Sequence, residues 1–368
     1  MIRPIGLYAH FPWCVRKCPY CDFNSHPLRG SLNEAGYVSA LIADLRSNLP
    51  GDVNISTVFF GGGTPSLFQA ESFAALLEEV APQLAEDAEV TMEANPGTTE
   101  HSDLRAYREA GINRLSIGAQ SFDDAALKRL GRIHHADETS DCATRARAAG
   151  FENINIDLMY GLPHQTPDQA IGDLEAALAL APEHISWYQL TIEPRTEFAR
   201  RPPQVPHEDE IAETEHLGRE RLEEAGFERY EVSAYARPYR LSRHNVNYWS
   251  FGDYVGIGAG AHGKLTTGRT VARTVKASQP RLYLQDPESQ EQQNVDADLL
   301  PFEFMLNALR LRDGVPLETF KQRTGLSLEV LDPIWGELAD EGLVHRHRIA
   351  TTPEGYRYLD SVISRFLS

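Results

Sequence analysis

The 368-residue sequence predicts an α/β fold: a parallel sheet that curves into a complete or partial barrel, followed by a small α+β domain. Over about 230 residues, short apolar runs rich in β-branched and aromatic residues alternate with helix-like stretches, which is typical of consecutive βαβ units. Polar side chains follow several of these runs at their carboxyl ends, where barrels place their functional groups. Together these observations favour a barrel, although the alternation alone is also compatible with an open, doubly wound sheet.

Strands are expected at the apolar runs that are bounded by turn residues. These runs are Leu7–Phe11, Thr57–Phe60, Val90–Ala94, Arg114–Gly118, Asn153–Met159, Ile185–Leu190 and Tyr230–Ala234. Helices are expected between them, at Ala35–Leu49, Glu71–Leu84, Ser102–Ala110, Ala136–Ala149 and Asp168–Leu180. Two of these helices are followed by Gly111 and Gly150, and glycine is the residue that most often ends a helix.

The C-terminal part of the sequence has a different pattern. Residues 281–295 are polar and rich in Gln, Asp and Glu, which predicts a linker. Helices are then expected at Pro301–Arg312, Leu317–Thr324 and Leu328–Gly342, followed by a hairpin of residues 343–345 and 349–351. Three helices and a hairpin in this order are typical of a winged helix. We therefore expect a barrel over residues 1–285, a linker over 286–300 and a winged-helix-like domain over 301–368.

The charge balance limits the partners of the chain. Its formal net charge of −18 argues against a protein that coats nucleic acid or anionic lipid, because those surfaces select basic patches. No apolar signal segment precedes Cys14, and no stretch approaches the roughly 20 apolar residues of a membrane helix. A soluble, cytoplasmic protein without nucleic acid is expected, with the C-terminal domain used for packing or protein contacts rather than DNA binding.

Three of the four cysteines fall within eight positions, at a C-x3-C-x2-C spacing that indicates metal in a reducing compartment. They are Cys14, Cys18 and Cys21. A structural zinc site usually has four ligands in two separated pairs, so a three-cysteine zinc knuckle completed by His10 or His26 is the alternative. A [4Fe–4S] cluster held by three thiolates keeps one iron free of protein, and a small molecule can bind there. Cys142 lies between small residues of an expected helix, where burial is expected rather than metal binding.

With this spacing after its first expected strand, the sequence resembles the radical-SAM superfamily, whose hallmark is the same three-cysteine motif. The resemblance continues through the expected barrel. It implies a partial (β/α)6 barrel, akin to a TIM barrel, in which S-adenosylmethionine (SAM) binds the free iron through its amino and carboxylate groups. It also implies that an electron from the cluster can cleave SAM to a 5′-deoxyadenosyl radical, while the protein orients the cofactor.

Glycines and polar side chains at successive strand ends are the candidate SAM contacts. Residues 61–65, Gly-Gly-Gly-Thr-Pro, follow one run, and glycines there let the backbone approach a ligand closely; an ordinary tight turn is the alternative. Glu93, Gln120 and Asp157 lie near the ends of later runs, where buried carboxylates need an internal ion pair or a ligand. The resemblance to coproporphyrinogen dehydrogenases and their relatives implies SAM contacts at Tyr8, Tyr20, Gly62, Gly63, Thr64, Glu93, Gln120, Arg132 and Asp157.

Within the superfamily, the sequence is similar over essentially its full length to a branch that comprises oxygen-independent coproporphyrinogen III oxidases and heme chaperones. The oxidases have a fourth cysteine in the pattern C-x3-C-x2-C-x-C, whereas this chain has Phe23 at that position. Residues 244–249, His-Asn-Val-Asn-Tyr-Trp, match the H-N-x-N-Y-W signature associated with the chaperones. A glycine-rich stretch, residues 251–258, follows it, as is typical of that group.

Heme is the further cofactor that this resemblance implies. Imidazole binds heme iron and aromatic faces cover porphyrin, so His244 is expected to be a heme ligand or pocket residue; an ordinary hydrogen-bonded histidine is the alternative. We expect a carrier that holds a [4Fe–4S] cluster, SAM and heme and delivers heme to apo-hemoproteins. Respiratory, membrane-associated clients and a homodimer are compatible with this hypothesis. The alternatives are oxidative decarboxylation of coproporphyrinogen III and radical chemistry on an unrelated substrate.

Overall fold

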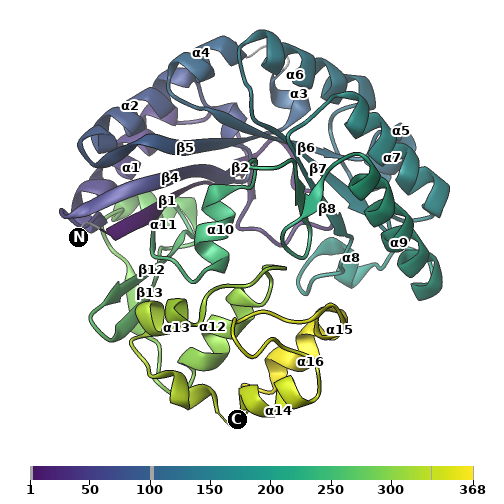
Figure 1. Ribbon diagram of the computed structural model, residues 1–368. Helices are drawn as coiled ribbons and strands as arrows, with labels where there is room; N and C mark the ends of the chain where they lie inside the picture. Colours follow the sequence, from purple (N-terminus) through teal and green to yellow (C-terminus); the bar gives the residue numbers. More distant parts are fainter. Residues whose placement is uncertain (1–2, 100–102, 333, 368) are drawn as a thin grey trace.

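Six parallel strands in sequence order form the centre of the structure, a computed structural model that describes residues 3–99, 103–332 and 334–367 (Figure 1). The strands are β1 (Arg3–Phe11), β4 (Val53–Gly62), β5 (Leu84–Ala94), β6 (Arg114–Gln120), β7 (Ile154–Tyr160) and β8 (His184–Gln189). The helices that follow them cover the outer face and are α1 (Glu34–Asn48), α2 (Ala70–Val80), α4 (Leu104–Glu109), α6 (Ala136–Ala148), α7 (Pro167–Ala179) and α9 (Glu208–Glu224). The predicted partial (β/α)6 barrel is therefore confirmed.

Alternation along the strands separates an apolar outer layer from a polar interior. On β1, Leu7 and Ala9 belong to the core beneath the helices, whereas Tyr8 and His10 face inward and hydrogen-bond each other. The inward positions of the next strands carry mostly polar side chains, namely Thr57, Glu89, Thr91, Glu93, Arg114, Ser116, Gln120, Asn155, Asp157 and His184. Burial of apolar surface against the helices thus stabilises the sheet, and the interior is left to groups suited to ligands.

The sheet continues past both ends of its parallel part. Next to β1 lies β11 (Tyr254–Ile257), parallel to it, followed by antiparallel strands β12 (His262–Thr267), β13 (Thr270–Val275) and β14 (Glu291–Asn294). Next to β8 lie the antiparallel strands β10 (Ala234–Ala236) and β9 (Glu228–Arg229). Within the described residues the outermost strands β14 and β9 do not pair, so the barrel is open on one side.

The strand expected at Tyr230–Ala234 is wrong over most of its length, because these residues form the turn between β9 and β10. The Glu231 carboxylate accepts a hydrogen bond from the Ser233 N–H at 2.8 Å. The Arg229 guanidinium donates to the carbonyls of Glu231 and Val232. Side-chain bonds to the backbone compete with strand pairing and favour a turn here.

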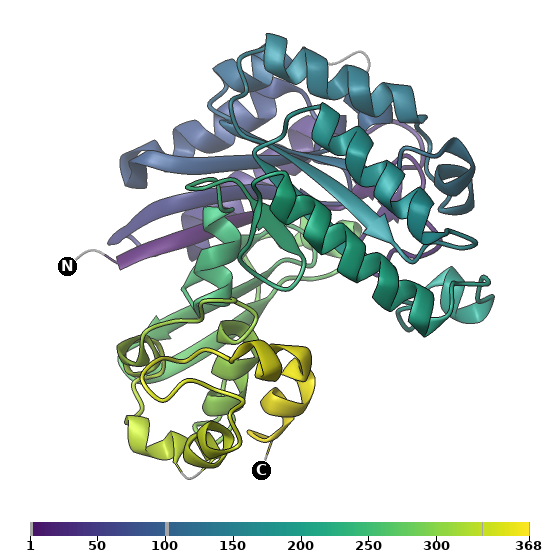
Figure 2. The ribbon, with the colours of Figure 1, turned by 45° about the vertical axis from the view of Figure 1, so that its right-hand side comes forward.

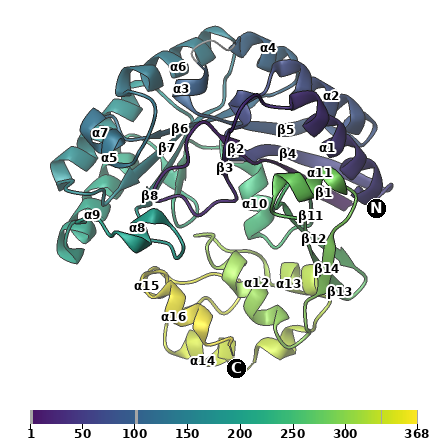
Figure 3. The same ribbon diagram turned by 180° about the vertical axis from the view of Figure 1, so that it is seen from behind.

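A short helix, α10 (Arg243–Trp249), lies on the open side of the barrel (Figure 3). It packs against the amino-terminal parts of β1 and β4, where Gly6 allows a close approach: a Cβ there would lie 3.3 Å from the His244 ring. The remaining elements of the barrel part are β2 (Trp13–Cys14), β3 (His26–Pro27), η1 (Pro65–Leu67), η2 (Ala81–Gln83), α3 (Pro96–Thr99), α5 (Asp124–Arg129), α8 (Glu197–Arg200) and α11 (Pro280–Gln285).

The C-terminal domain has its own apolar core, which includes Phe304, Phe320, Trp335 and Phe366. Its elements are α12 (Leu300–Ala308), α13 (Leu317–Thr324), η3 (Leu328–Leu331), α14 (Ile334–Asp340), α15 (Pro353–Arg357) and α16 (Leu359–Ser364). Single antiparallel bridges join residue 344 to 351 and residue 315 to 349, at the position of the expected hairpin. The helix expected over Leu328–Gly342 is instead divided into η3 and α14, with Pro333 of that span outside the described residues.

The two parts meet on the open side of the barrel (Figure 2). Arg310 lies over the Trp249 ring, 4.4 Å from its centroid, and pairs with Glu231 at 3.4 Å. The segment 286–300 contains β14, which extends the barrel sheet, so the proposed division at this linker stays a prediction. No helix of the described residues has the length and apolar character needed to cross a membrane.

Candidate cluster and cofactor site

The three clustered cysteines lie on the loop between β1 and α1, at the carboxyl end of β1. Pairing of β2 with β3 folds this loop back on itself. The Cys14 carbonyl accepts the Leu28 N–H at 2.8 Å, and the Cys18 carbonyl accepts the Cys21 N–H at 3.1 Å. These bonds hold the three cysteines on one compact loop.

The thiols are half-buried neighbours. Burial raises the pKa of Cys14, a Thr64 hydrogen bond opposes that shift, and the charges of Cys21 and Cys18 raise the pKa further. The Cys21 Sγ lies 3.6 Å from Ser25 Oγ. Among the described residues, no three metal-binding side chains converge on a position that a single ion would take. In a cubane each thiolate binds a different iron, so the ligands of a [4Fe–4S] cluster need not converge on one ion-sized position.

His10 and His26, the alternative fourth ligands of a zinc site, are engaged elsewhere. The two His10 ring nitrogens lie 2.9 Å from Tyr8 Oη and 2.9 Å from the Asn24 carbonyl. His26 Nε2 lies 3.1 Å from Asn24 Oδ1. The Asn24 amide in turn donates to the Ala259 carbonyl at 2.8 Å. Both histidines therefore help to fix the cysteine loop against the segment that follows β11.

The predicted glycine turn ends β4 directly beside the cysteine loop. Gly62 has φ of +116°, and a Cβ there would lie 2.5 Å from the His10 ring. A Cβ at Gly63 would lie 2.6 Å from the Trp13 carbonyl oxygen. Only glycine fits both positions without displacing a neighbour, and the backbone is therefore exposed to whatever lies above the strand ends.

Glu93 and Asp157 are the carboxylates of this end of the interior. Burial and the nearby Asp157 charge raise the pKa of Glu93 to about 8. Glu93 Oε2 accepts the Gly62 N–H at 3.0 Å, whereas Asp157 accepts from Ser116 Oγ at 3.0 Å and Asn155 Nδ2 at 2.8 Å. Neither carboxylate forms an ion pair within the described residues, which argues against the internal-salt-bridge alternative. Each can accept further hydrogen bonds from a ligand.

Gln120 and Arg132 are the other polar side chains that the sequence predicted at this end of the interior. Gln120 ends β6 with φ of 68°, a conformation rare for residues with a side chain and frequent at functional sites. Its Oε1 accepts the Tyr188 hydroxyl at 2.8 Å. Arg132 donates to the Gly118 carbonyl at 2.6 Å, and its charge opposes the rise in the pKa of Tyr20 that burial causes.

The nine candidate SAM residues and the three cysteines thus lie at one end of the barrel. Electrostatic effects link them: Glu93 raises the pKa of Tyr8, after the larger effect of burial, and Arg132 acts on both Tyr20 and Cys14. The arrangement offers carboxylates, a guanidinium, amide and backbone groups around one position above the sheet. Such a set fits a zwitterionic, nucleoside-containing ligand next to a cluster, and these roles remain predictions.

His244 lies toward the amino ends of the strands, and of the candidate SAM residues Tyr8 lies near it, with 6.5 Å between the two ring centroids. The His244 ring is buried, with Nδ1 3.0 Å from Thr57 Oγ1 and the Phe59 ring 5.1 Å away. Burial and the Arg114 charge lower the pKa of His244 to about 4, so the imidazole is neutral near pH 7. Its aromatic neighbours are Tyr8 of β1 and Phe59 of β4. Tyr248 and Trp249, of the same helix as His244, pack on each other with 4.9 Å between their ring centroids.

Several residues that support the site had not been predicted from the sequence. Three of them hydrogen-bond a candidate residue: His10 bonds to Tyr8, Tyr188 to Gln120, and Asn155 to Asp157. The alternation within each strand was the available signal, because residues two positions apart on one strand face the same side. By that rule His10 accompanies Tyr8, and Asn155 accompanies Asp157. Cys142, as expected, is buried in the core, where it accepts a hydrogen bond from Thr99 at 3.3 Å.

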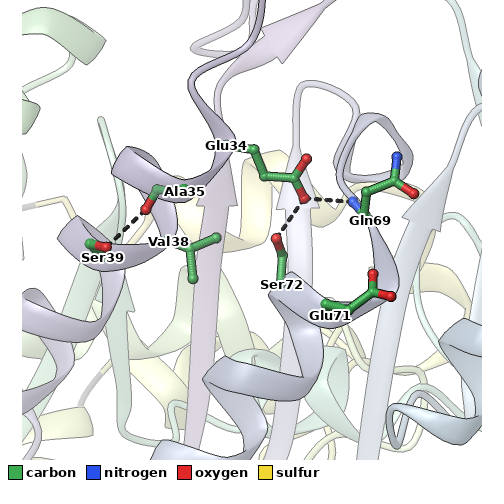
Figure 4. A pocket seen from close by; sticks show the side chains of 7 residues that line it. All are labelled: Glu34, Ala35, Val38, Ser39, Gln69, Glu71 and Ser72. Atoms are coloured by element: carbon green, nitrogen blue, oxygen red, sulfur yellow. Dashed lines mark hydrogen bonds between the residues drawn. The ribbon is translucent and has the colours of Figure 1, made fainter.

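A surface cavity of about 540 Å³ lies elsewhere, between the first turns of α1 and α2 (Figure 4). Glu34 reaches across it and accepts hydrogen bonds from the Gln69 N–H at 2.6 Å and from Ser72 Oγ at 2.5 Å. None of the predicted site residues lines this cavity. The polar groups of this cavity serve to connect α1 and α2. The arrangement of side chains that suits a ligand is the one at the strand ends.

Comparison with known proteins gives the class and the family. Residues 8–177 match the radical SAM superfamily, and residues 295–358 match the HemN C-terminal domain. The coproporphyrinogen III oxidase HemN from Escherichia coli, described as a radical SAM enzyme, has the same fold, with a TM-score of 0.82, 22% identity, and coverage of 99% of this chain and 90% of that one. The partial barrel and its three-cysteine loop thus define a radical-SAM protein.

Two curated relatives are much closer in sequence. Heme chaperone HemW of Escherichia coli K12 is 45% identical over 375 residues, covering 100% of this chain and 99% of that protein. Heme chaperone HemW of Haemophilus influenzae is 47% identical over 336 residues, covering 89% and 88%. A mitochondrial protein of mouse, radical S-adenosyl methionine domain-containing protein 1, is 41% identical over 292 residues, covering 77% and 65%. The chain belongs to the HemW family of the radical SAM superfamily.

Proposed function

We propose that this protein is a heme chaperone that binds a [4Fe–4S] cluster, SAM and heme and delivers the heme to apo-hemoproteins. The observation that carries the proposal is the full-length similarity, at 45% identity, to a protein named as a heme chaperone. Phe23 supports it from the site itself: this side chain is 61% exposed and lies two residues after Cys21, at the position of the oxidases' fourth cysteine.

The cluster would be held by Cys14, Cys18 and Cys21. When bound, it supplies electron-transfer chemistry and an open iron for a small chelating ligand. The chain's own contribution is positional: the Asn24 bonds fix the loop, and the glycine turn brings backbone groups close to the ligand. SAM would be oriented by the carboxylates and guanidinium described above, with Tyr8, Tyr20, Gln120 and Thr64 completing its surroundings.

Heme is proposed to bind on the open side of the barrel, where α10 carries His244. A neutral imidazole is the form that binds iron, and the His244 environment maintains that form near pH 7. Its ring is buried and Nδ1 faces Thr57, so ligation by His244 requires α10 to shift outward or Nε2 to face the ligand. We propose cytoplasmic action, where the three thiols stay reduced, and clients that include membrane-associated hemoproteins. Nucleic acid is not proposed as a partner, and a homodimer remains compatible.

The experiment that tests this function starts with anaerobic reconstitution using iron and sulfide. Heme is then titrated and followed by absorbance, while coproporphyrinogen III turnover with SAM is assayed alongside. Stoichiometric heme uptake without turnover supports the carrier, and transfer of that heme to an apo-hemoprotein completes it. Turnover to protoporphyrinogen without a stable heme complex contradicts it and favours the oxidase alternative, whose fold this chain shares.

The role of His244 needs a separate variant. His244→Ala should lower heme affinity while leaving the iron content of the cluster unchanged, because the ring lies away from the cysteine loop. His216→Ala is a matched control, since its side chain is exposed on α9. Equal heme binding by wild type and His244→Ala would remove this residue from the proposed heme site without removing the chaperone function.

A further inference from the structure

Arg114, at the start of β6, is a buried cation with no partner for its guanidinium among the described residues. It is 2% exposed and faces the barrel interior on the same side of the strand as Ser116. Its Nε has no hydrogen-bond partner, and no described residue accepts a hydrogen bond from its guanidinium or lies within ion-pair distance of it. An unpaired buried guanidinium is costly, so the position calls for an explanation.

The other deeply buried cations of the described residues show how the fold normally treats such charges. Lys264 lies 2.8 Å from an Asp253 carboxylate oxygen, and Lys276 lies 2.7 Å from Asp44. Both are held inside the protein by a carboxylate. Arg114 is equally buried and lacks one, which suggests that its carboxylate comes from a ligand.

The acidic residue on the neighbouring strand does not fill this role. Glu89 of β5 directs its two carboxylate oxygens to the backbone N–H groups of Arg243 and His244, at 3.1 Å each. Arg243, the first residue of α10, pairs with Asp87 at 3.3 Å. Among the residues that the structure describes, Arg114 is therefore the positive charge without a carboxylate partner in this part of the interior.

The surroundings of Arg114 come from both sides of the barrel opening. Its charge acts on His244 of α10 and on His184 and Tyr230 on the β8 side. His184 is fixed by bonds to Asn155 at 2.6 Å and to the Tyr230 hydroxyl at 2.9 Å. The ring nitrogens of His184 are thus satisfied, and the guanidinium remains the group that can take an anion.

We propose that Arg114 binds the carboxylate of a ligand that enters through the open side of the barrel. A planar guanidinium matches a carboxylate in a two-pronged, charge-assisted hydrogen bond. The proposal rests on the heme-binding function proposed above in one respect, because it identifies the carboxylate as a propionate of heme. A small free carboxylate has the same chemistry, and the test distinguishes the two sources.

The first arm of the test compares hemin with hemin dimethyl ester, whose propionates are blocked, in optical titrations of reconstituted wild-type protein. We expect hemin to bind about 10- to 100-fold more tightly, as a buried charge-assisted contact implies. Arg114→Met should reduce that preference to about threefold or less, and Arg114→Lys should keep part of it. Arg105→Met, an exposed arginine of α4, is the matched control and should keep all of it.

The second arm needs no heme. Thermal unfolding of the protein without cofactors is followed in sodium acetate and in sodium chloride at equal ionic strength. If free carboxylates are the ligand, acetate raises the Tm of wild type and of Arg105→Met, but not of Arg114→Met. That result together with equal binding of hemin and its ester would retain the carboxylate site and overturn the propionate assignment.

The outcomes separate the two proposals. Failure of wild type to bind hemin or its ester contradicts the chaperone function, while the acetate arm still decides on Arg114. Equal binding of hemin and ester together with no acetate effect overturns the site, even if heme binds well. The ester comparison and the acetate comparison on wild type need no variant, so a folding defect of Arg114→Met does not prevent a decision.

Discussion

The two ends of the barrel interior are built differently. At the carboxyl ends of the strands, the Glu93 and Asp157 carboxyl groups are held by hydrogen bonds from Gly62, Ser116 and Asn155, so their positions are fixed by the fold. Toward the amino ends, Arg114 and His244 provide a positive charge and a neutral imidazole, and Arg114 has no such support. The fold itself supplies hydrogen-bond partners for the carboxyl groups at the carboxyl end. At the amino end, the guanidinium of Arg114 lacks such partners among the described residues.

The two ends would suit ligand groups of opposite charge, as the proposed pair of ligands requires. The carboxyl end, with acidic groups beside the cysteine loop, suits the cationic part of a ligand bound to a cluster. The opposite end suits a ligand with carboxylates and a metal that imidazole binds. A carrier that holds SAM and heme together would use both ends, and the following experiments change the carboxyl end while leaving Arg114 and His244 in place.

The largest effect is expected at the cysteine loop. Cys18→Ser should reduce the iron content after reconstitution from about four per chain to a small remainder, because one ligand of the cubane is lost. Cys142→Ala is the matched control, since this buried thiol belongs to the helix layer. Iron and sulfide analysis with absorbance spectra decides; an unchanged iron content in Cys18→Ser would contradict the assignment of the cluster.

Gly62→Ala should be strongly destabilising. Its φ of +116° and the 2.5 Å approach of a Cβ to the His10 ring imply a loss of about 3–5 kcal/mol in the free energy of unfolding. Urea denaturation measures it, and SAM affinity should fall as well. Gly172→Ala in α7 has open space around its Cβ and should be neutral or stabilise by up to about 1 kcal/mol. Equal stability of the two variants would contradict the close packing of the turn.

Glu93→Gln should reveal a pH dependence. The pKa of Glu93 is about 8 in the folded protein and about 4.5 when unfolded, so the unfolded state loses its proton first as pH rises. The stability that the neutral carboxyl contributes is complete below about pH 4.5 and is lost as pH rises toward 8. Wild type should therefore lose about 2–4 kcal/mol relative to Glu93→Gln between pH 5 and pH 8.

The measurement is urea unfolding of both proteins, without cofactors, at several pH values across that range. Glu79→Gln is the control, because this glutamate pairs with Arg46 at the surface and its pKa is lowered rather than raised. A constant difference between wild type and Glu93→Gln at all pH values would show that the carboxyl is not held in its neutral form.

The smallest effect is expected for Tyr188→Phe, which removes the donor that fixes Gln120. One lost hydrogen bond should cost about 1 kcal/mol in unfolding free energy and a few-fold in SAM affinity. Heme affinity should not change, because Tyr188 belongs to the carboxyl end. Tyr239→Phe, at a fully exposed tyrosine, is the control for loss of a hydroxyl. A larger effect on heme than on SAM would contradict the separation of the two ends.

Much of the fold and of the site at the carboxyl end was already determined by the sequence. The apolar runs defined the six parallel strands because the residues of each strand that pack against the helices must be apolar, and the helices followed from their period. The cysteine spacing and the strand-end residues Glu93, Gln120 and Asp157 were recognisable because parallel strands bring their carboxyl ends to one edge. Family signatures, rather than physical patterns, identified Tyr20 and Arg132.

The arrangement of the groups at the amino end of the barrel interior depends on the tertiary structure. Its groups come from β4, β5, β6, β8 and α10, which are far apart in sequence, and no local pattern indicates that Arg114 lacks a carboxylate or that Glu89 binds backbone N–H groups instead. The failed strand at Tyr230–Ala234 has a local cause instead, because side-chain bonds of Glu231 and Arg229 to backbone groups two or three residues away outweigh the β propensity of the run. Propensity acts over a few residues, whereas the pairing of charges depends on which distant segments the fold brings together.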